Sequence, residues 1–377
     1  MPKMLASTLG VLMLIVSFEN MSQAQEGPAV GPDSQAWAQA RARGVSFLKA
    51  AQAPDGSWTS SQAPGITGLI TYALLRSGES ADDPAVSKAL THLQTFVQPD
   101  GGIYNARGTN GNYETAICLL AFRAANQNGR YQTLIAAAER YLRRLQWDES
   151  ENIDRSDVRY GGAGYGRSGD RPDLSNTSFF LDALKAAGAR ADDPAFQKAL
   201  VFVSRCQNLE TEFNTTPFAA KVNDGGFYYT PAAGGNSQAG ETPEGGLRSY
   251  GSMTYAGLKS MIYAGLTPED PRVQAAISWI RKFYTLDENP GMGQQGLYYY
   301  YHTFAKALDA LGIDWFEDAH GKRHDWRREL AEHLIQRQQE NGSWVNANPR
   351  WMEGDPHLST AYSLLALDYC KLRSTNR

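Results

Sequence analysis

The chain has 377 residues, with 40 acidic and 36 basic side chains and a formal net charge of -4. Hydrophobic residues make up 42% of it and charged residues 20%, a globular composition that excludes an intrinsically disordered chain. Because there is no strong positive excess, a basic nucleic-acid binder is excluded too, and no nucleic-acid partner is expected.

Residues 1–24 have the pattern of a signal peptide. Lys3 supplies the positive start, residues 5–18 are largely apolar, and residues 22–24 offer small side chains for cleavage before Gln25. The apolar run is short for a membrane span, so we expect an exported protein, periplasmic or secreted, without a transmembrane span after cleavage. An uncleaved N-terminal anchor is the alternative. Residues 25–34 are expected to form a short linker.

A turn of glycine followed by an aromatic residue recurs along the rest of the chain. Its copies lie at residues 52–58, 98–104, 160–165, 223–228, 296–298 and 338–344. Asp-Gly and Asn-Gly pairs favour tight turns because glycine accepts a positive φ. We expect Trp58 and Trp344 to be structural residues that fill the gaps between neighbouring helix pairs.

A helix rich in Ala, Leu and Thr is predicted after each turn. These helices cover residues 65–75, 113–124, 175–187, 250–264, 300–311 and 358–369. Small apolar residues on two sides indicate helices that are packed on both faces, and hence an inner layer.

A second set of helices begins at a repeated spacing. Gly78, Gly188 and Gly265 are each followed five residues later by an Asp-Pro pair. Glycine ends one helix, aspartate caps the next, and proline fits its first turn. Six turns with six inner and six outer helices predict an all-α fold, an α/α toroid of about six helix pairs over residues 35–373, and a monomer.

The pattern Gln-x-x-x-Gly-x-Trp at residues 52–58 and 338–344 resembles the repeat motif of squalene and hopene cyclases. With the helix around residues 360–367, it resembles the prenyltransferase and squalene oxidase repeat. The resemblance covers roughly residues 35–373. It implies the toroid of the superfamily that contains triterpene cyclases and protein prenyltransferase β subunits, with an isoprenoid or other hydrophobic small molecule in a central cavity.

The chemistry of that superfamily is not matched residue by residue. The Asp-x-Asp-Asp acid of squalene cyclases is absent, and the Asp pairs at 82–83 and 192–193 are explained by helix capping. Asp368 and Cys370 have the spacing of prenyltransferase zinc ligands, but they lie at the far end of their helix. A metal site of two histidines and one carboxylate is conceivable, but the separation of these residues in the sequence gives it no geometric support. No metal is therefore expected, and the cofactor is unknown. The longer link at residues 312–325 is read as a structural elaboration.

The starts of the inner helices are expected to surround one mouth of the cavity. The candidate catalytic residues there are His302, His357, Glu114 and Asp355, as acid, base or holders of a polar head. The candidate substrate-binding residues are Asn176, Tyr250, Tyr298, Tyr300, Tyr301 and Trp351. Aromatic faces can hold an isoprenoid or stabilise a carbocation. The alternatives are capping of helices by the polar residues and packing between helices by the rings.

Three functions fit these observations. The first is an exported terpenoid-cyclase-like toroid that binds or transforms an isoprenoid or other hydrophobic ligand, of terpene cyclase or mutase type if it is an enzyme. The second is a polysaccharide lyase or hydrolase, which would need paired carboxylates such as Glu353 and Asp355 for hydrolysis. The third is a noncatalytic binding or scaffold protein, consistent with the missing acid motif.

Overall fold

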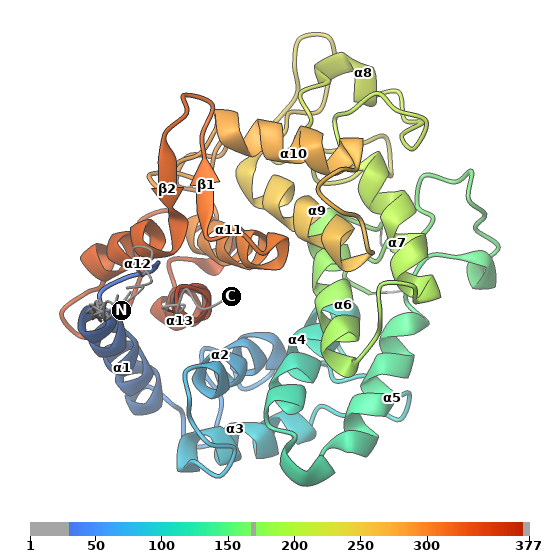
Figure 1. Ribbon diagram of the computed structural model, residues 1–377. Helices are drawn as coiled ribbons and strands as arrows, with labels where there is room; N and C mark the ends of the chain where they lie inside the picture. Colours follow the sequence, from blue (N-terminus) through green and yellow to red (C-terminus); the bar gives the residue numbers. More distant parts are fainter. Residues whose placement is uncertain (1–29, 167–170, 372–377) are drawn as a thin grey trace, which may run out of the picture.

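Six helices with apolar residues on nearly all faces form an inner ring. They are α2 (Pro64–Arg76), α4 (Gly111–Ala124), α6 (Leu174–Ala187), α9 (Gly251–Tyr263), α11 (Leu297–Leu311) and α13 (Pro356–Tyr369). The computed structural model describes residues 30–166 and 171–371. Each inner helix packs against the next, and α13 packs against α2, which closes the ring (Figure 1). The predicted α/α toroid is confirmed.

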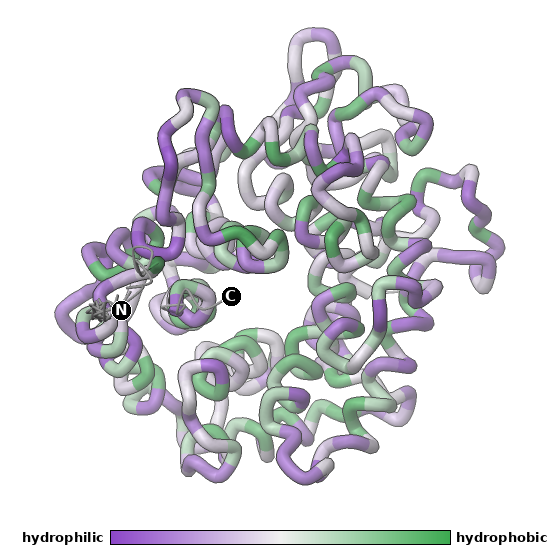
Figure 2. The backbone as a smooth tube through the Cα atoms, viewed as in Figure 1, coloured by the Kyte–Doolittle hydropathy of each residue, from purple (hydrophilic) through white to green (hydrophobic). Residues whose placement is uncertain are grey.

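Six amphipathic helices surround this ring. They are α1 (Ser34–Ala50), α3 (Pro84–Gln94), α5 (Gln132–Arg143), α7 (Pro194–Arg205), α10 (Pro271–Lys282) and α12 (Trp326–Arg337). Asp83, Asp193 and Asp270 cap α3, α7 and α10 by accepting hydrogen bonds from first-turn amides, as predicted. Figure 2 shows hydrophobic residues along α2 and α4, and hydrophilic residues on the outer helices and peripheral loops.

A glutamine at the equivalent position of four repeats joins a turn to an outer helix. Gln52 donates from Nε2 to the carbonyl oxygens of Gly56 (3.0 Å) and Ala85 (2.8 Å), the latter in α3. Gln146, Gln207 and Gln338 make the equivalent pairs of bonds. The bond from Gln338 reaches α1, so the last repeat is joined to the first and the outer layer closes as well.

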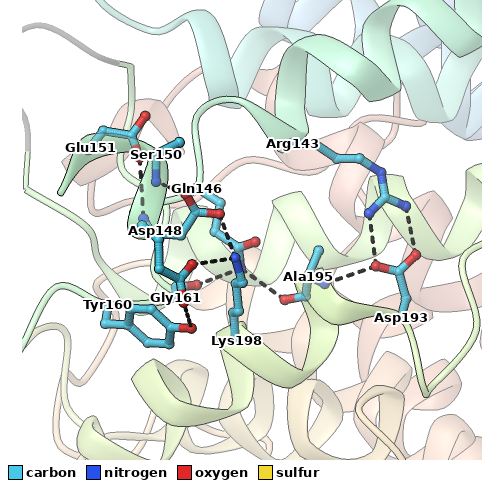
Figure 3. A network of polar contacts seen from close by, with 11 residues as sticks. Arg143, Gln146, Asp148, Ser150, Glu151, Tyr160, Gly161, Asp193, Ala195 and Lys198 are labelled. Atoms are coloured by element: carbon cyan, nitrogen blue, oxygen red, sulfur yellow. Dashed lines mark hydrogen bonds and ion pairs between the residues drawn. The ribbon is translucent and has the colours of Figure 1, made fainter. Parts of the chain in front are cut away.

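The joint between α5 and α7 shows how charge supplements this glutamine bond (Figure 3). Arg143 in α5 holds both carboxylate oxygens of Asp193, the cap of α7, at 2.8 Å. Lys198 in α7 contacts Asp148 at 2.9 Å and Glu149 at 2.6 Å in the preceding loop. These ion pairs fix the outer helices of adjacent repeats against each other.

Trp58 and Trp344 occupy the positions predicted for structural residues. Their side chains are 1% and 0% exposed. The indole Nε1 of Trp58 donates to the carbonyl of Leu48 at 2.8 Å, and that of Trp344 to Leu334 at 2.7 Å. Each indole ring is thus packed between its turn and the outer helix that precedes it.

The remaining elements are short and peripheral. They are α8 (Ala219–Val222), the 3₁₀ turns η1 (Gln127–Gly129), η2 (Glu149–Glu151) and η3 (Arg350–Met352), and the antiparallel strands β1 (Trp315–Glu317) and β2 (Arg323–Asp325). The two strands make a hairpin of the long link at residues 312–325. Within residues 30–166 and 171–371, no cluster of three or more His, Cys, Asp or Glu side chains is arranged to hold a metal ion.

The N-terminal segment is described only from Val30 onward, so the predicted signal peptide at 1–24 lies outside the described residues. Val30 and Gly31, in the predicted linker, are buried, and the amide of Gly31 donates to Asp325 at 2.9 Å. In the described part of the chain, every helix is too short or too polar to span a bilayer.

Candidate functional site

A cavity of about 420 Å³ opens where the inner helices begin. Its walls come from the first two turns of these helices and from the loops that lead into them. The aromatic lining residues are Tyr113, Tyr165, Phe179, Tyr229, Tyr250, Tyr299, Trp351 and Tyr362, and the acidic ones are Glu114 and Glu353. None of the described lining residues is a lysine, arginine or histidine. Its size and mixed apolar and polar lining are typical of a small-molecule site.

Four rings from four inner helices line this cavity, and we name them the aromatic floor: Tyr113, Phe179, Tyr299 and Tyr362. Phe179 lies edge-on to Tyr113, with ring centroids 5.4 Å apart, and is stacked on Tyr299 at 6.0 Å. Tyr299 contacts Tyr362, with ring centroids 5.8 Å apart. The three contacts join the four rings in one chain along the cavity wall.

Glu114, a predicted catalytic residue, lines the cavity. Its side chain is 4% exposed, and its Oε2 accepts a hydrogen bond of 2.8 Å from the amide of Asn105. Burial raises the pKa of the carboxyl group above its ordinary value, and this bond opposes the shift only in part. Glu114 is therefore more readily protonated than an exposed glutamate.

Glu353 lies across the N-terminus of α11. Its carboxylate accepts hydrogen bonds from the amides of Tyr299 (2.8 Å) and Tyr298 (3.1 Å) and from Nδ2 of Asn346 (2.7 Å). Burial raises its pKa, while these donors and the positive end of the helix act in the opposite sense. Because Gly296 has no side chain to cap α11, the loop at 346–355 supplies the cap from outside.

Three polar residues meet at the mouth, and we name them the rim trio: Thr59, Asp355 and His357. The hydroxyl of Thr59 donates to Asp355 Oδ2 at 2.5 Å and lies 3.1 Å from His357 Nδ1. Asp355 also caps α13 by accepting from the amide of His357 at 2.9 Å. Asp355 and His357 are therefore brought together at the rim, but only Thr59 of the three is a lining residue.

Beneath the aromatic floor lies a buried charge cluster of Asp182, Lys259 and Lys306. The two lysine ammonium groups contact the two carboxylate oxygens of Asp182 at 2.6 and 2.7 Å. All three side chains are at most 8% exposed. Burial lowers the pKa of Lys259 to about 8 although Asp182 acts against the shift. The cluster links α6, α9 and α11 one or two turns deeper than the cavity.

His302 belongs to this deeper layer, so the prediction that it faces the cavity is wrong. Its ring contacts Tyr362 with centroids 5.8 Å apart, and its Nδ1 has no hydrogen-bond partner among the described residues. Burial, helped by the charge of Lys306, lowers its pKa to about 3. It is therefore a neutral imidazole behind the aromatic floor, separate from His357.

The run of four tyrosines at 298–301 contributes one ring to the cavity, and it is Tyr299. The hydroxyls of Tyr298, Tyr300 and Tyr301 donate to the carbonyls of Val345, Thr285 and Leu286, so these rings pack between helices. Four consecutive helical residues point about 100° apart and cover the whole circumference, so all of them cannot face one cavity. The prediction that Tyr298, Tyr300 and Tyr301 bind substrate is corrected accordingly.

The other three predicted binding residues lie at or near the mouth. Tyr250 and Trp351 line the cavity, and Trp351 is 44% exposed at its lip. Asn176 is not a lining residue: its Nδ2 donates to Asp173 at 2.7 Å, at the start of α6. Asn176 therefore supports the helix start, by holding the carboxylate of Asp173, which caps α6.

Sequence reasoning missed most of the aromatic floor and the role of Glu353. Tyr113 and Tyr362 fall inside predicted inner helices, but nothing in a single helix marks which ring faces the bore. Their position in the sequence nevertheless indicates the cavity. Each residue of the aromatic floor lies in the first two turns of its inner helix, which is the end near the mouth.

Comparisons with known proteins agree with this geometry. Residues 60–230 match the family of the squalene-hopene cyclase C-terminal domain. The apo structure of the type II terpene cyclase MstE from Scytonema is similar at a TM-score of 0.55 and 13% identity, covering 89% of this chain and 98% of that chain. No curated protein sequence gives a significant match.

Two further structures of MstE variants from Scytonema are similar. One is a complex with geranylgeranyl dihydroxybenzoate, given as substrate (TM-score 0.55, 11% identity, 89% of this chain, 97% of that chain). The other is a complex with merosterolic acid A, given as product (TM-score 0.52, 12% identity, 89% and 97%). At this identity the likeness establishes the fold.

Proposed function

Proceeding from a terpenoid-cyclase-like toroid, we propose that this protein binds an isoprenoid chain in the cavity above the aromatic floor. The aromatic floor is the observation that carries the proposal. Four π faces and the lining residues Ile66, Met253 and Leu358 offer an apolar chain a hydrophobic wall. The MstE complexes, with a prenylated substrate and its product, support the same class of ligand.

In this proposal Glu114 is the proton donor of a transformation that begins at an alkene. Its proton would form a C–H bond with the π electrons of the double bond and leave a positive charge on the neighbouring carbon. The aromatic floor and the Glu353 carboxylate are placed to stabilise that charge. Loss of a proton from a carbon beside the cation to the Glu114 carboxylate would form a new double bond and restore the acid. Glu114 then supplies the proton that the Asp-x-Asp-Asp acid, absent from this chain, supplies in squalene cyclases.

Binding can be measured directly on the purified protein. Squalene and geranylgeraniol are delivered from cyclodextrin, and the retained lipid is quantified by mass spectrometry after gel filtration. Phe179→Leu and Tyr299→Leu keep apolar bulk but remove a π face, and each is expected to weaken binding about fivefold. Phe283→Leu is the matched control, because Phe283 is 38% exposed at the end of α10.

If neither lipid binds, the proposal is wrong, and binding of an oligosaccharide instead would favour the glycan alternative. If lipids bind, product analysis with Glu114→Gln tests the chemistry. If the wild type turns over the lipid and the Glu114→Gln variant does so too, Glu114 is not the proton donor. If neither protein turns over a bound lipid, the function that remains is lipid binding without catalysis.

We also propose that the chain is exported, on the pattern of residues 1–24. Secretion from a bacterial host followed by N-terminal sequencing is expected to recover a chain that begins at Gln25. Retention of Met1 in a membrane fraction would favour the uncleaved anchor.

A further inference from the structure

Thr59 has a backbone conformation that its side chain disfavours. Its φ is +63°, a region that β-branched residues rarely occupy. The amide of Ser60 donates to the carbonyl of Trp58 at 2.6 Å, so Thr59 is the central residue of a γ-turn with positive φ, a rare and strained turn. Such a conformation persists only where surrounding contacts hold it.

The turn motif itself does not require this strain. The last repeat has the same Gly-Ser-Trp sequence at residues 342–344, followed by Val345. Val345 is not among the described residues with positive φ, and the next amide, of Asn346, donates to Glu353 instead of closing a γ-turn. The strain at Thr59 therefore belongs to its own surroundings, which are the rim trio.

The strained turn presents the Thr59 hydroxyl to the cavity. Thr59 is exposed and lines the mouth. Its hydroxyl donates its one proton to Asp355 Oδ2, at 2.5 Å. His357 Nδ1 lies 3.1 Å from the hydroxyl oxygen and 3.3 Å from Asp355 Oδ1, so a proton on this nitrogen can be donated to either oxygen. Lone pairs of the Asp355 carboxylate stay available to accept a hydrogen bond from a group that arrives at the mouth.

The charges of the site restrict what that group can be. Glu114 and Glu353 line the cavity, Asp355 lies at its rim, and the described lining residues include no cation. The guanidinium of Arg171 lies outside the lining, 5.8 Å from the centre of the Tyr229 ring. The guanidinium of Arg350 lies outside the lining, 4.3 Å from the centre of the Trp351 ring, and donates to the side-chain oxygens of Gln238 and Gln295. A diphosphate would meet carboxylates here, whereas a neutral hydroxyl can donate to one of them.

We propose that the rim trio recognises a hydroxyl head group, so that the ligand is an isoprenoid alcohol or phenol. This inference rests on the proposed function, since it assumes that the apolar chain occupies the cavity. The aromatic floor then holds the chain, and the trio selects the end of the molecule that stays at the mouth.

Three probes that share one chain test this assignment: geranylgeraniol, its diphosphate, and the hydrocarbon that lacks the hydroxyl. For the wild-type protein we expect the alcohol to bind about tenfold more tightly than the hydrocarbon, the size of one hydrogen bond to a charged group. The diphosphate should bind more weakly than the alcohol.

Two variants should abolish the preference without changing hydrocarbon binding. Thr59→Gly removes the hydroxyl and suits the positive φ, and Asp355→Asn removes the charge but keeps a residue that caps helices well. Thr91→Val, a hydroxyl removed from the surface of α3, is the control and should keep the preference. Circular dichroism confirms that each variant is folded.

The two proposals fail in different ways. Equal binding of alcohol and hydrocarbon by the wild type, or a preference that survives both variants, would overturn the role of the rim trio and leave isoprenoid binding intact. Tighter binding of the diphosphate would overturn it as well. If none of the three probes binds, the proposed function itself is wrong.

Discussion

The two halves of the bore, above and below the aromatic floor, are built from the same helices but use polar residues in opposite ways. Above it, Glu114 and Glu353 line an open cavity and are satisfied chiefly by backbone amides. Below it, Asp182 is matched by Lys259 and Lys306, and Lys259 also donates to the carbonyl oxygen of Ser178 at 3.2 Å.

The difference shows how a ring of parallel inner helices can be both rigid and hollow. Ion pairs deep in the ring connect α6, α9 and α11, and a buried charge that has its partner is tolerated there. At the mouth, Glu114 and Glu353 have no cationic partner among the described lining residues, so their carboxyl groups are available to a ligand. The floor separates these two environments.

The largest expected effect is a loss of unfolding free energy caused by a substitution below the aromatic floor. Asp182→Asn removes the charge that both lysines face, and leaving buried ammonium groups unpaired typically costs ~3–5 kcal/mol. Urea unfolding measures the loss. Asp82→Asn is the control, because Asp82 is 73% exposed in its pair with Arg130 and such pairs contribute at most about 1 kcal/mol. Equal losses would mean that the buried cluster is not a structural element.

The pH dependence of stability should have opposite signs in the two halves. The raised pKa of Glu114 means that the folded state favours its protonated form, so its contribution is lost as pH rises above its ordinary range. The pKa of His302 is lowered to about 3, so stability is lost as pH falls from about 6.5 toward 3.

Two variants separate these contributions in unfolding measurements across pH 3 to 8. Compared with the wild type, Glu114→Gln should gain stability progressively as pH rises, and His302→Asn should lose less of its stability as pH falls. A difference from wild type that is constant with pH would contradict the assignment of either group. A histidine signal for residue 302 titrating near pH 6.5 in NMR spectra would contradict it independently.

The smallest effect concerns the strained mouth. Thr59→Gly loses a hydrogen bond but relieves the positive φ, so we expect stability within about 1 kcal/mol of wild type. Val345→Gly, at the same place in the last repeat, has no such strain to relieve and should be the more destabilised of the two in thermal unfolding. The reverse order would show that Thr59 is relaxed.

The sequence by itself determined the fold. Glycine turns, Asp-Pro helix starts and the Gln-x-x-x-Gly-x-Trp motif act through local geometry and through bonds repeated in each unit, such as those of Gln52 and Gln338. Because such signals recur, each copy supports the next, and the closed ring with structural Trp58 and Trp344 could be predicted without knowing any distance.

Only the tertiary structure decided the site. Sequence position indicated that helix starts surround a mouth, which placed Glu114, Tyr250 and Trp351 on the cavity wall. It could not choose Tyr299 over its three neighbours, separate His302 from His357, or join Thr59 to Asp355 across 296 positions. These outcomes depend on the rotation of each helix about its own axis and on ring closure, which are set by packing of all six inner helices together and are encoded in no single segment.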